Sequence, residues 1–253
     1  MRGYDERSYG DGFADVYDEW YADVTDVDAT VRRMTALAGP GGSVLELGVG
    51  TGRLAIPMTT AGLRVVGVDS SQPMLDRLAE SDTAGTVTVI RGDMVDDLPD
   101  GPFDAALVAY NTIFNILDAE GQQRCFDAVA ARLRPGATFV VEAFVPDADR
   151  PPTSTSDVSV RSLAADRVVL SVSVDDPEHQ RAEGQFVQFT ESGGVRLRPW
   201  SIRWSTPEQL DEMAERAGLV LRDRSTDMTG TPFTPDSEQH VSVYEKPEAV
   251  DEQ

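Results

Sequence analysis

A seven-residue stretch, residues 46–52, constrains the fold of this chain more than any other feature. It follows the apolar pair Val44–Leu45 and carries glycine at alternate positions, Gly48, Gly50 and Gly52. Alternating glycines let the backbone turn sharply with positive φ and let a ligand lie against it without meeting a Cβ. Because apolar residues precede and follow the stretch, it predicts a strand, a glycine turn and a helix. This arrangement is typical of nucleotide-binding α/β folds.

Carboxylates near the ends of three apolar runs indicate what the turn holds. Glu46 stands just before the glycines, Asp69 closes the next apolar run nineteen residues after Gly50, and Asp93 follows the third run. An acid at the end of the second strand accepts hydrogen bonds from a ribose diol and repels a ribose phosphate. Three acids at neighbouring strand ends would crowd a pyrophosphate but suit a ligand that carries an amine and a sulfonium charge.

Five elements in order resemble class I S-adenosylmethionine-dependent methyltransferases. They are the glycine turn, Asp69, the triplet Gly92-Asp93-Met94, the strand Phe103–Val108 and the segment Leu133-Arg134-Pro135-Gly136. The resemblance covers roughly the first 145 residues and resumes near the C-terminus. The glycine turn taken alone fits a dinucleotide oxidoreductase equally well, so an NAD-type enzyme stays open as an alternative, as does a non-catalytic S-adenosylmethionine-binding module.

The resemblance implies a fold, a cofactor and a set of binding residues. The fold is α/β: a seven-stranded, mostly parallel Rossmann-like sheet flanked by helices. The cofactor is S-adenosyl-L-methionine. Met74 is either an apolar wall for the adenine or a plain core residue. The expected cofactor-binding residues outside the N-terminal segment are Glu46, Gly48, Gly50, Gly52, Arg53, Asp69, Ser70, Met74, Asp93, Met94 and Tyr110.

Aromatic residues cluster before the first strand. Phe13, Tyr17, Trp20 and Tyr21 are spaced by three and four residues, which predicts one helical face. That face either caps the sheet or forms a lid. In methyltransferases with a similar start the segment folds over the cofactor, so the resemblance implies cofactor contacts for Tyr17 and Tyr21, with Trp20 as a further wall. Aromatic faces also attract a sulfonium cation.

The acceptor side is expected where the fourth and fifth strands end. Asn111, Thr112 and Asn115 follow the fourth strand and can orient an acceptor or satisfy loop backbone, and Glu142 ends the fifth strand. Glu142 either binds a cationic substrate or removes its proton, or it forms a salt bridge to a loop arginine. No catalytic residue is assigned; the candidates are Tyr21, Asn115 and Glu142. Since a hydroxyl acceptor needs a general base and none is persuasive, nitrogen is slightly favoured over oxygen.

The second half of the chain alternates in a strand-like way. Residues 158–161, 167–174, 184–189 and 195–204 predict antiparallel strands, inserted between the fifth strand and the last helix. The insert resembles amino-sugar N-methyltransferases, in which such a sheet covers the substrate or builds a dimer. Arg196, Arg198 and Trp200 are candidate acceptor contacts, although a solvated strand face explains the arginines equally well.

These segments predict how the chain is divided. Residues 1–146 form the N-terminal lid and cofactor-binding core, and residues 147–205 form the inserted sheet. Residues 206–247 return to the core with the last helix and two strands, the final one antiparallel, and residues 248–253 form a disordered tail.

Composition narrows the partners. The chain has 22 basic and 44 acidic residues, a net charge of −22, which opposes phosphate backbones and disfavours nucleic acid. No apolar run is long enough to span a membrane. Cys125 is the single cysteine, which favours a reducing, cytoplasmic setting, and no residue cluster has zinc spacing. The expected partners are a small-molecule acceptor and a possible second copy of the chain in a homodimer.

Overall fold

A seven-stranded sheet forms the centre of the computed structural model, which describes residues 1–22, 24–147 and 153–248. Its strand order is β10-β11-β5-β4-β1-β2-β3. The strands from β1 to β5 are parallel, and β11 runs antiparallel to both β5 and β10. The predicted α/β sheet and its antiparallel last strand are therefore confirmed. The bounds are β1 Ser43–Leu47, β2 Arg64–Asp69, β3 Thr88–Arg91, β4 Phe103–Val108, β5 Leu133–Phe144, β10 Val220–Ser225 and β11 Gln239–Glu245.

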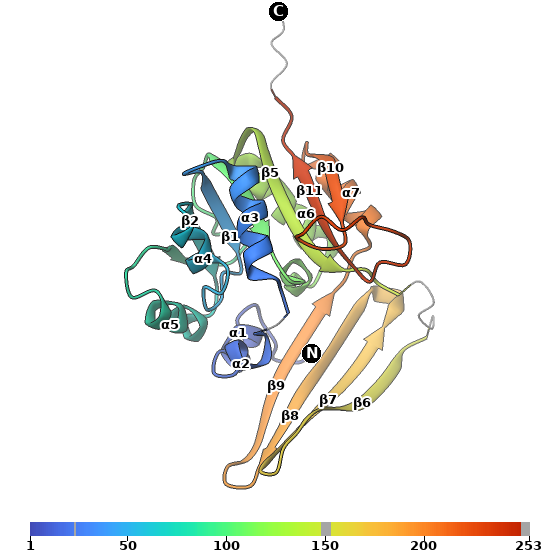
Figure 1. Cartoon of the computed structure of the whole chain (residues 1–253). Helices are drawn as coiled ribbons and strands as arrows, with labels where there is room; N and C mark the ends of the chain where they lie inside the picture. The colour runs from blue at the N-terminus through green and yellow to red at the C-terminus, as the bar shows by residue number, and fades with distance from the viewer. Residues whose placement is uncertain (23, 148–152, 249–253) are drawn as a thin grey trace, which may run out of the picture.

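Helices flank this sheet (Figure 1). Two begin where the sequence places a capping residue: the Ser71 hydroxyl accepts from the Met74 amide at the start of α5, and Thr206 forms a capping box with Gln209 at the start of α7. Strands β1 and β4 are almost wholly buried because helices cover both faces. The bounds are α3 Val27–Ala38, α4 Ala55–Thr60, α5 Gln72–Ser81, α6 Ala119–Arg132 and α7 Pro207–Arg216.

A second, four-stranded sheet is inserted between β5 and α7. Its strands β6 Thr155–Leu163, β7 Arg167–Asp176, β8 Arg181–Thr190 and β9 Gly194–Arg203 pair antiparallel in chain order, with a short 3-10 turn, η2 Pro177–His179, between β7 and β8. The predicted insert is confirmed. Its base is tied to α6, where the buried Gln122 side chain donates to the Arg203 carbonyl oxygen at 2.7 Å and accepts from the Arg203 guanidinium at 2.8 Å.

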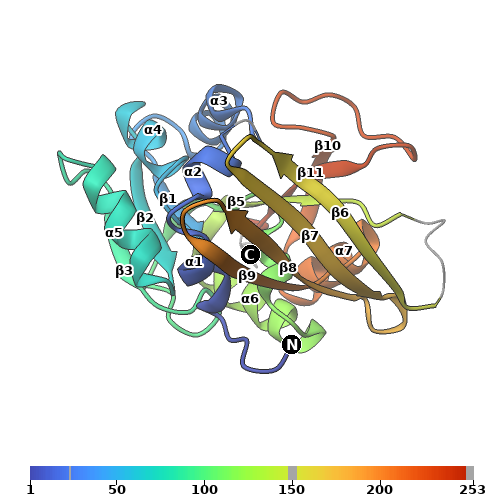
Figure 2. The same cartoon turned by 90° about the horizontal axis from the view of Figure 1, so that it is seen from below.

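The N-terminal aromatics lie on two short helices, α1 Ser8–Phe13 and α2 Tyr17–Trp20, rather than on one helical face. Both views show these helices beside β9 (Figures 1 and 2). The prediction of a single face is wrong because the aromatics have two different neighbours. Phe13 and Trp20 pack edge-on against Phe186 of β8, whereas Tyr17 packs against Tyr21.

Two features complete the described chain. A 3-10 turn, η1 Thr112–Asn115, follows β4 at the carboxyl edge of the central sheet. None of the helices in the described ranges combines the length and apolar character that a membrane crossing requires. Residues 148–152 of the predicted insert and residues 249–253 of the predicted tail lie outside the described residues. The division into core, insert and return segment remains a prediction.

Candidate active site

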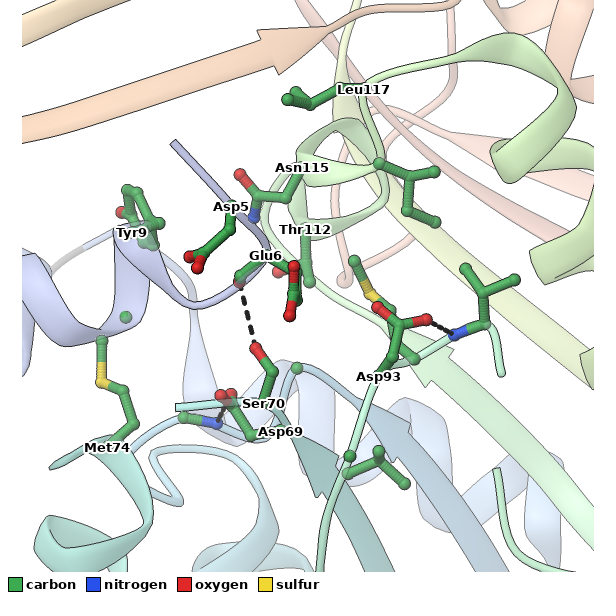
Figure 3. A pocket seen from close by; sticks show the side chains of 18 of the residues that line it. Asp5, Glu6, Tyr9, Asp69, Ser70, Met74, Asp93, Thr112, Asn115 and Leu117 are labelled. Atoms are coloured by element: carbon green, nitrogen blue, oxygen red, sulfur yellow. Dashed lines mark hydrogen bonds between the residues drawn. The ribbon is translucent and has the colours of Figure 1, made fainter. Parts of the chain in front are cut away.

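A cavity of about 520 Å³ opens at the carboxyl edge of the central sheet (Figure 3). Its floor comes from the glycine turn and from the ends of β2 and β3, and its opposite wall comes from residues before α1 and from η1. In Figure 3, Asp69, Ser70 and Asp93 rise from the floor, and Asp5, Glu6 and Tyr9 face them from the N-terminal segment. The lining residues are Tyr4, Asp5, Glu6, Tyr9, Gly10, Tyr17, Gly48, Gly50, Val68, Asp69, Ser70, Met74, Gly92, Asp93, Met94, Val95, Asp96, Thr112, Asn115, Ile116, Leu117 and Arg124.

The glycine turn needs its glycines for two different reasons. Gly48 has φ +69°, and a Cβ there would stand 2.4 Å from the Thr112 Cγ2 atom of η1. Gly50 has φ +54°, and the only other atom within 4 Å of a Cβ there would be the Gly48 carbonyl oxygen, at 4.0 Å. Gly48 therefore permits the close approach of η1, while Gly50 leaves open backbone at the cavity floor, where a planar ligand can rest.

Asp69 and Asp93 anchor this floor through backbone amides. Asp69 accepts from the Gly50 amide at 2.9 Å and, through its other oxygen, from the Ser71 amide at 2.9 Å. Burial raises the pKa of Asp69, although these two amide bonds oppose the shift. Asp93 accepts from the Val95 amide at 2.8 Å. Each carboxylate keeps lone pairs for a ligand, since an ionised carboxylate has about four acceptor positions.

Two ionisable side chains beside the glycine turn, the buried Glu46 and the half-buried Arg53, have buried atoms without hydrogen-bond partners within the described structure. Glu46 is 3% exposed, and its Oε2 atom has no partner. Burial raises the pKa of Glu46 to about 8, while the nearby Arg53 charge opposes this. The Nε and Nη1 atoms of Arg53 are likewise buried without partners. Neither residue is among those that line the cavity. Buried polar atoms without a partner are costly, so Glu46 and Arg53 are candidates for contacts with a ligand.

Four tyrosines stand together at the N-terminal side of the turn. Tyr17 lines the cavity, and burial raises its pKa to about 12, while the nearby Arg53 charge opposes the shift. Its ring lies 4.9 Å from that of Tyr21, which contacts the Tyr110 ring edge-on at 6.0 Å. Burial raises the pKa of Tyr9 well above its ordinary value, and it also raises the pKa of Tyr110. The phenols of Tyr9, Tyr17 and Tyr110 are therefore neutral at physiological pH and can donate hydrogen bonds.

The segment before α1 covers the cavity, which the sequence pattern did not reveal. The Ser70 hydroxyl donates to the Glu6 carbonyl oxygen at 3.0 Å, and the Ser71 hydroxyl donates to Asp11 at 2.7 Å. These bonds bring Tyr4, Asp5, Glu6, Tyr9 and Gly10 to the wall. One signal was available: Tyr9 precedes Phe13 by four residues, and the two rings stack at 4.4 Å.

The loop after β4 is strained and held by the end of β5. Tyr110 and Asn111 both have positive φ, +43° and +65°. The Glu142 carboxylate accepts from the Tyr110 amide at 2.9 Å, and the Asn111 side chain accepts from the Phe144 amide at 2.7 Å. Burial raises the pKa of Glu142, while the Tyr110 bond opposes the shift. Glu142 and Asn111 therefore shape the loop that carries Thr112 and Asn115 to the cavity.

The structure brings only part of the predicted site to the cavity wall. The predicted residues that line it are Tyr17, Gly48, Gly50, Asp69, Ser70, Met74, Asp93, Met94, Thr112 and Asn115. Those that lie outside the lining are Trp20, Tyr21, Glu46, Gly52, Arg53, Tyr110, Asn111 and Glu142. From the insert, Arg196 and Arg198 pair with Asp15 at 2.7 and 2.6 Å, and Trp200 packs on the N-terminal aromatic cluster. Ile116, Leu117 and Arg124 line the cavity without having been predicted.

Comparison with known proteins identifies the family. A family model described as a methyltransferase domain matches residues 44–136. The solved structure of the CcbJ methyltransferase from Streptomyces caelestis is 38% identical, with a TM-score of 0.89 over 96% of this chain and 100% of that one. The chain belongs to the class I S-adenosylmethionine-dependent methyltransferases.

Two further relatives extend this result. This chain is 29% identical to the cypemycin N-terminal methyltransferase from a Streptomyces species. The match extends over 209 residues, which are 81% of this chain and 84% of the relative. The chain shares its fold with the sugar N-methyltransferase KedS8 from a Streptoalloteichus species, at 22% identity and a TM-score of 0.67 over 98% of this chain and 99% of that one. S-adenosylmethionine is its cofactor, which sets aside the dinucleotide oxidoreductase and the non-catalytic module.

Across the described ranges, no group of three or more His, Cys, Asp or Glu side chains is arranged to hold a metal ion. The buried Cys125 hydrogen-bonds the Met94 carbonyl oxygen, and burial raises its thiol pKa to about 12, so it is a packing residue.

Proposed function

We propose that this methyltransferase transfers a methyl group to an amine nitrogen of a small molecule, bound where the cavity meets the N-terminal segment and η1. The observation that carries the proposal is the composition of the wall opposite the glycine turn. Asp5, Glu6 and Asn115 offer carboxylates and an amide there, Arg124 is the one basic side chain in the described lining, and that lining contains neither histidine nor lysine. A wall of this kind attracts a cationic amine and has few groups able to remove a proton from a hydroxyl.

The floor is proposed to hold the donor. Gly50 leaves room for the adenosine, Asp69 accepts from the ribose diol, and Asp93 with Met74 borders the adenine. The unpartnered atoms of Glu46 and Arg53 match the ammonium and carboxylate of the methionine end. Tyr17, close to the Arg53 charge, is proposed to place a neutral phenol between that end and the acceptor. When bound, the cofactor supplies an activated methyl group on a sulfonium leaving group.

The titration behaviour of the wall favours nitrogen over oxygen. Hydrogen bonds from Arg7 and Ser8 lower the pKa of Asp5, which leaves it ionised and a weak base. Burial raises the pKa of Tyr4 to about 12 and that of Tyr9 further, so neither is a phenolate at neutral pH. An amine needs only to release a proton to solvent before it attacks, whereas a hydroxyl needs a strong base beside it.

Positioning is the main contribution expected from the protein. Asn115 can hold the acceptor by hydrogen bonds while Tyr9 and the N-terminal segment exclude water from the cavity. Holding the acceptor nitrogen in line with the bond that breaks can contribute on the order of 7–11 kcal/mol at its upper limit. Tyr21 and Glu142, which lie outside the lining, are proposed to support Tyr17 and the Tyr110–Asn111 turn rather than to contact the acceptor.

The names of relatives support the same reading. The cypemycin relative is called an N-terminal methyltransferase, and KedS8 a sugar N-methyltransferase. Both names specify nitrogen acceptors of different size, which fits a common donor floor beneath a variable wall. A cytoplasmic setting, expected from the single cysteine, is part of the proposal.

A labelled-methyl assay tests the proposal. The protein is incubated with tritiated S-adenosylmethionine and with matched pairs of amino sugars, amino acids and cyclic amines, each paired with the analogue in which a hydroxyl replaces the amine. We expect transfer to members of the amine series, with a rate that rises as pH increases and the amine loses its proton. Transfer to the hydroxyl analogues at equal or higher rate would overturn the assignment to nitrogen.

A further inference from the structure

One basic side chain borders the cavity among several acidic ones. Arg124 is the single basic residue of the described lining. The acidic residues of the same lining are Asp5, Glu6, Asp69, Asp93 and Asp96. Arg124 is exposed, and none of the hydrogen bonds or ion pairs within the described chain involves its side chain. Its guanidinium therefore has all its donors available for an anionic group of a ligand.

Helix α6 holds the backbone of Arg124 at the rim of the cavity. The neighbouring Gln122 and Cys125 are fully buried. The Gln122 side chain donates to the Ile116 carbonyl oxygen at 3.1 Å, just after η1. The Cys125 thiol donates to the Met94 carbonyl oxygen at 3.7 Å, in the segment after β3. The backbone at Arg124 is thus tied to two walls of the cavity, while the side chain itself remains unpaired.

A second hollow meets the cavity at this point. It has a volume of about 460 Å³ and lies between α6 and α7. Among the described residues, Arg124 alone lines both this hollow and the cavity. The guanidinium therefore stands at the boundary between the two spaces. An acceptor that is too large for the cavity beside the donor can extend past Arg124 into the α6–α7 hollow.

The donor offers Arg124 no anion to bind. In the arrangement proposed above, its single carboxylate lies at Arg53, beside the glycine turn. The rest of the donor carries a sulfonium, an ammonium and an uncharged nucleoside. The wall that leads into α6 passes through Asn115 and Leu117, away from the floor (Figure 3). An anionic group that reaches Arg124 must therefore come from the acceptor.

The charge of the lining selects the kind of anion. A phosphate monoester carries about 1.5 to 2 negative charges at neutral pH, so it meets more repulsion from the acidic side chains than a carboxylate does. A carboxylate carries one charge, which one arginine neutralises, and its two oxygens match the fork of the guanidinium in a bidentate pair. A single arginine among several acids is therefore suited to a carboxylate.

We propose that Arg124 binds the carboxylate of the acceptor, so that the acceptor is an amino acid or a larger molecule that carries both an amine and a carboxylate. This inference rests on the proposed transfer to an amine nitrogen. Asp5 and Glu6 would then attract the amine while Arg124 pairs with the carboxylate, so that each charge of the acceptor meets an opposite charge. Arg124 selects the acceptor and takes no part in the transfer itself.

Calorimetric titration of the protein saturated with S-adenosylhomocysteine tests this proposal without requiring turnover. The probes are glycine, β-alanine, γ-aminobutyrate, ε-aminocaproate and phenylalanine, each compared with its primary amide. Phosphoethanolamine and its propyl homologue form a third arm. We expect the acid to bind more tightly than its amide for those probes whose length spans from the acidic wall to Arg124.

Arg124→Met should reduce the preference for acid over amide by about 10- to 100-fold. Comparing the preference in parent and variant cancels the different basicity of the amine in an acid and its amide. Arg124→Lys keeps the charge but loses the bidentate fork, so we expect an intermediate reduction. In the labelled-methyl assay, Arg124→Met should raise KM for amino acids more than KM for their amides.

Arg32→Met is the matched control. It removes the same charge from an exposed arginine of α3 that lines neither the cavity nor the α6–α7 hollow. The control should keep the acid preference of the parent protein. An equal reduction in Arg32→Met and Arg124→Met would show an effect of net charge and overturn the proposed contact.

Three further results would overturn the proposal. The first is an acid preference that is absent from the parent protein or unchanged in Arg124→Met. The second is a loss of S-adenosylhomocysteine affinity in Arg124→Met with the preference intact, which would assign Arg124 to the donor. The third is tighter, Arg124-dependent binding of the phosphates than of the carboxylates. Absence of methyl transfer to every amine would instead refute the proposed function, and the titration distinguishes the two failures because it measures binding alone.

Discussion

The floor and the cover of the cavity are built in different ways. The floor consists of the glycine turn and the ends of β2 and β3, held by bonds from backbone amides to carboxylates, such as that from the Gly50 amide to the Asp69 side chain. The cover consists of residues 4–10 and η1, held by side-chain contacts from distant parts of the chain, among them Ser70 to Glu6 and the insert's Arg198 to Asp15. The floor is therefore determined locally and the cover by tertiary contacts.

We propose that this difference separates the two substrates of the enzyme. The donor would meet the floor, where backbone amides hold the Asp69 and Asp93 carboxylates in place. The acceptor would meet the cover, which can change without disturbing the sheet. Variants of the floor should therefore act on donor binding, and variants of the cover on acceptor kinetics and on stability.

The largest expected effect is that of Gly50→Arg on the floor. At φ +54° a non-glycine residue is strained, and the arginine side chain would occupy the space left for the adenosine. We expect donor affinity to fall by about 1,000-fold or more, measured by calorimetric titration with S-adenosylhomocysteine. Gly85→Arg is the control: Gly85 has φ +62° and equally open space, but it lies outside the cavity lining. Equal loss in both variants would contradict a local effect.

The next largest effect is the pH dependence of stability caused by the buried Glu46. Because burial raises the pKa of Glu46 from 4.5 to about 8, the ligand-free folded protein binds a proton that the unfolded chain has released. This contribution to stability is complete below pH 4.5 and is lost as pH rises through about 8. It amounts to several kcal/mol at most, by the linkage of ~1.4 kcal/mol per pKa unit.

Glu46→Gln should remove that dependence. Urea unfolding between pH 5 and 9 is expected to show the parent protein losing stability relative to the variant as pH rises, while the variant binds the donor more weakly. Exposed Glu120→Gln serves as the control and should track the parent protein. A constant stability difference between parent and Glu46→Gln across this pH range would show that Glu46 keeps its charge in the ligand-free fold.

Arg198→Ala tests the cover. Arg198 is 1% exposed and donates to Asp15, to the Gly12 carbonyl oxygen and to Gln188. Its loss should cost about 3 kcal/mol of unfolding free energy and lower kcat/KM for the acceptor about 10-fold, with donor affinity nearly unchanged. Arg196→Ala removes an exposed arginine that pairs with the same Asp15, and should cost under about 1 kcal/mol. A matching fall in donor affinity would mean that floor and cover are not separable.

The smallest effect is expected where floor and cover touch. In Gly48→Ala the new Cβ would stand 2.4 Å from Thr112 Cγ2 and would displace η1. We expect about a 10-fold fall in kcat/KM from this shift together with the strain at φ +69°. Adding Thr112→Ala removes the clashing methyl group and should restore part of the activity. An additive loss in the double variant would place the defect in the backbone strain alone.

Local sequence patterns predicted the glycine turn and the strands. They failed for residues whose position depends on tertiary contacts. Ser71 and Thr206 cap helices as their sequence context suggests, because capping involves residues only two or three positions apart. The alternation in residues 155–203 correctly predicted four antiparallel strands. It could not show that Arg196 and Arg198 pair with Asp15, since the partner lies about 180 residues away.

The cover escaped prediction for a similar reason. Residues 4–7 have no apolar periodicity, and their position follows from bonds to Ser70 and from the docking of α1 on β9. The aromatic spacing of residues 13–21 indicated one helical face, but the segment forms two helices, α1 and α2. Phe13 and Trp20 pack against Phe186 of the insert, whereas Tyr17 lines the cavity. The same spacing could have predicted Tyr9, because it lies four residues before Phe13 and the two rings stack.

A crystal structure of the protein with S-adenosylhomocysteine tests the central claim most directly. The account predicts the adenosine against Gly48 and Gly50, the ribose diol within hydrogen-bond distance of Asp69, and the amino-acid end between Glu46 and Arg53. The space between Asp5 and Asn115 should remain open for the acceptor. A ligand whose ribose lies away from Asp69, or which fills the space beside Asp5, would contradict the division of the cavity into donor floor and acceptor cover.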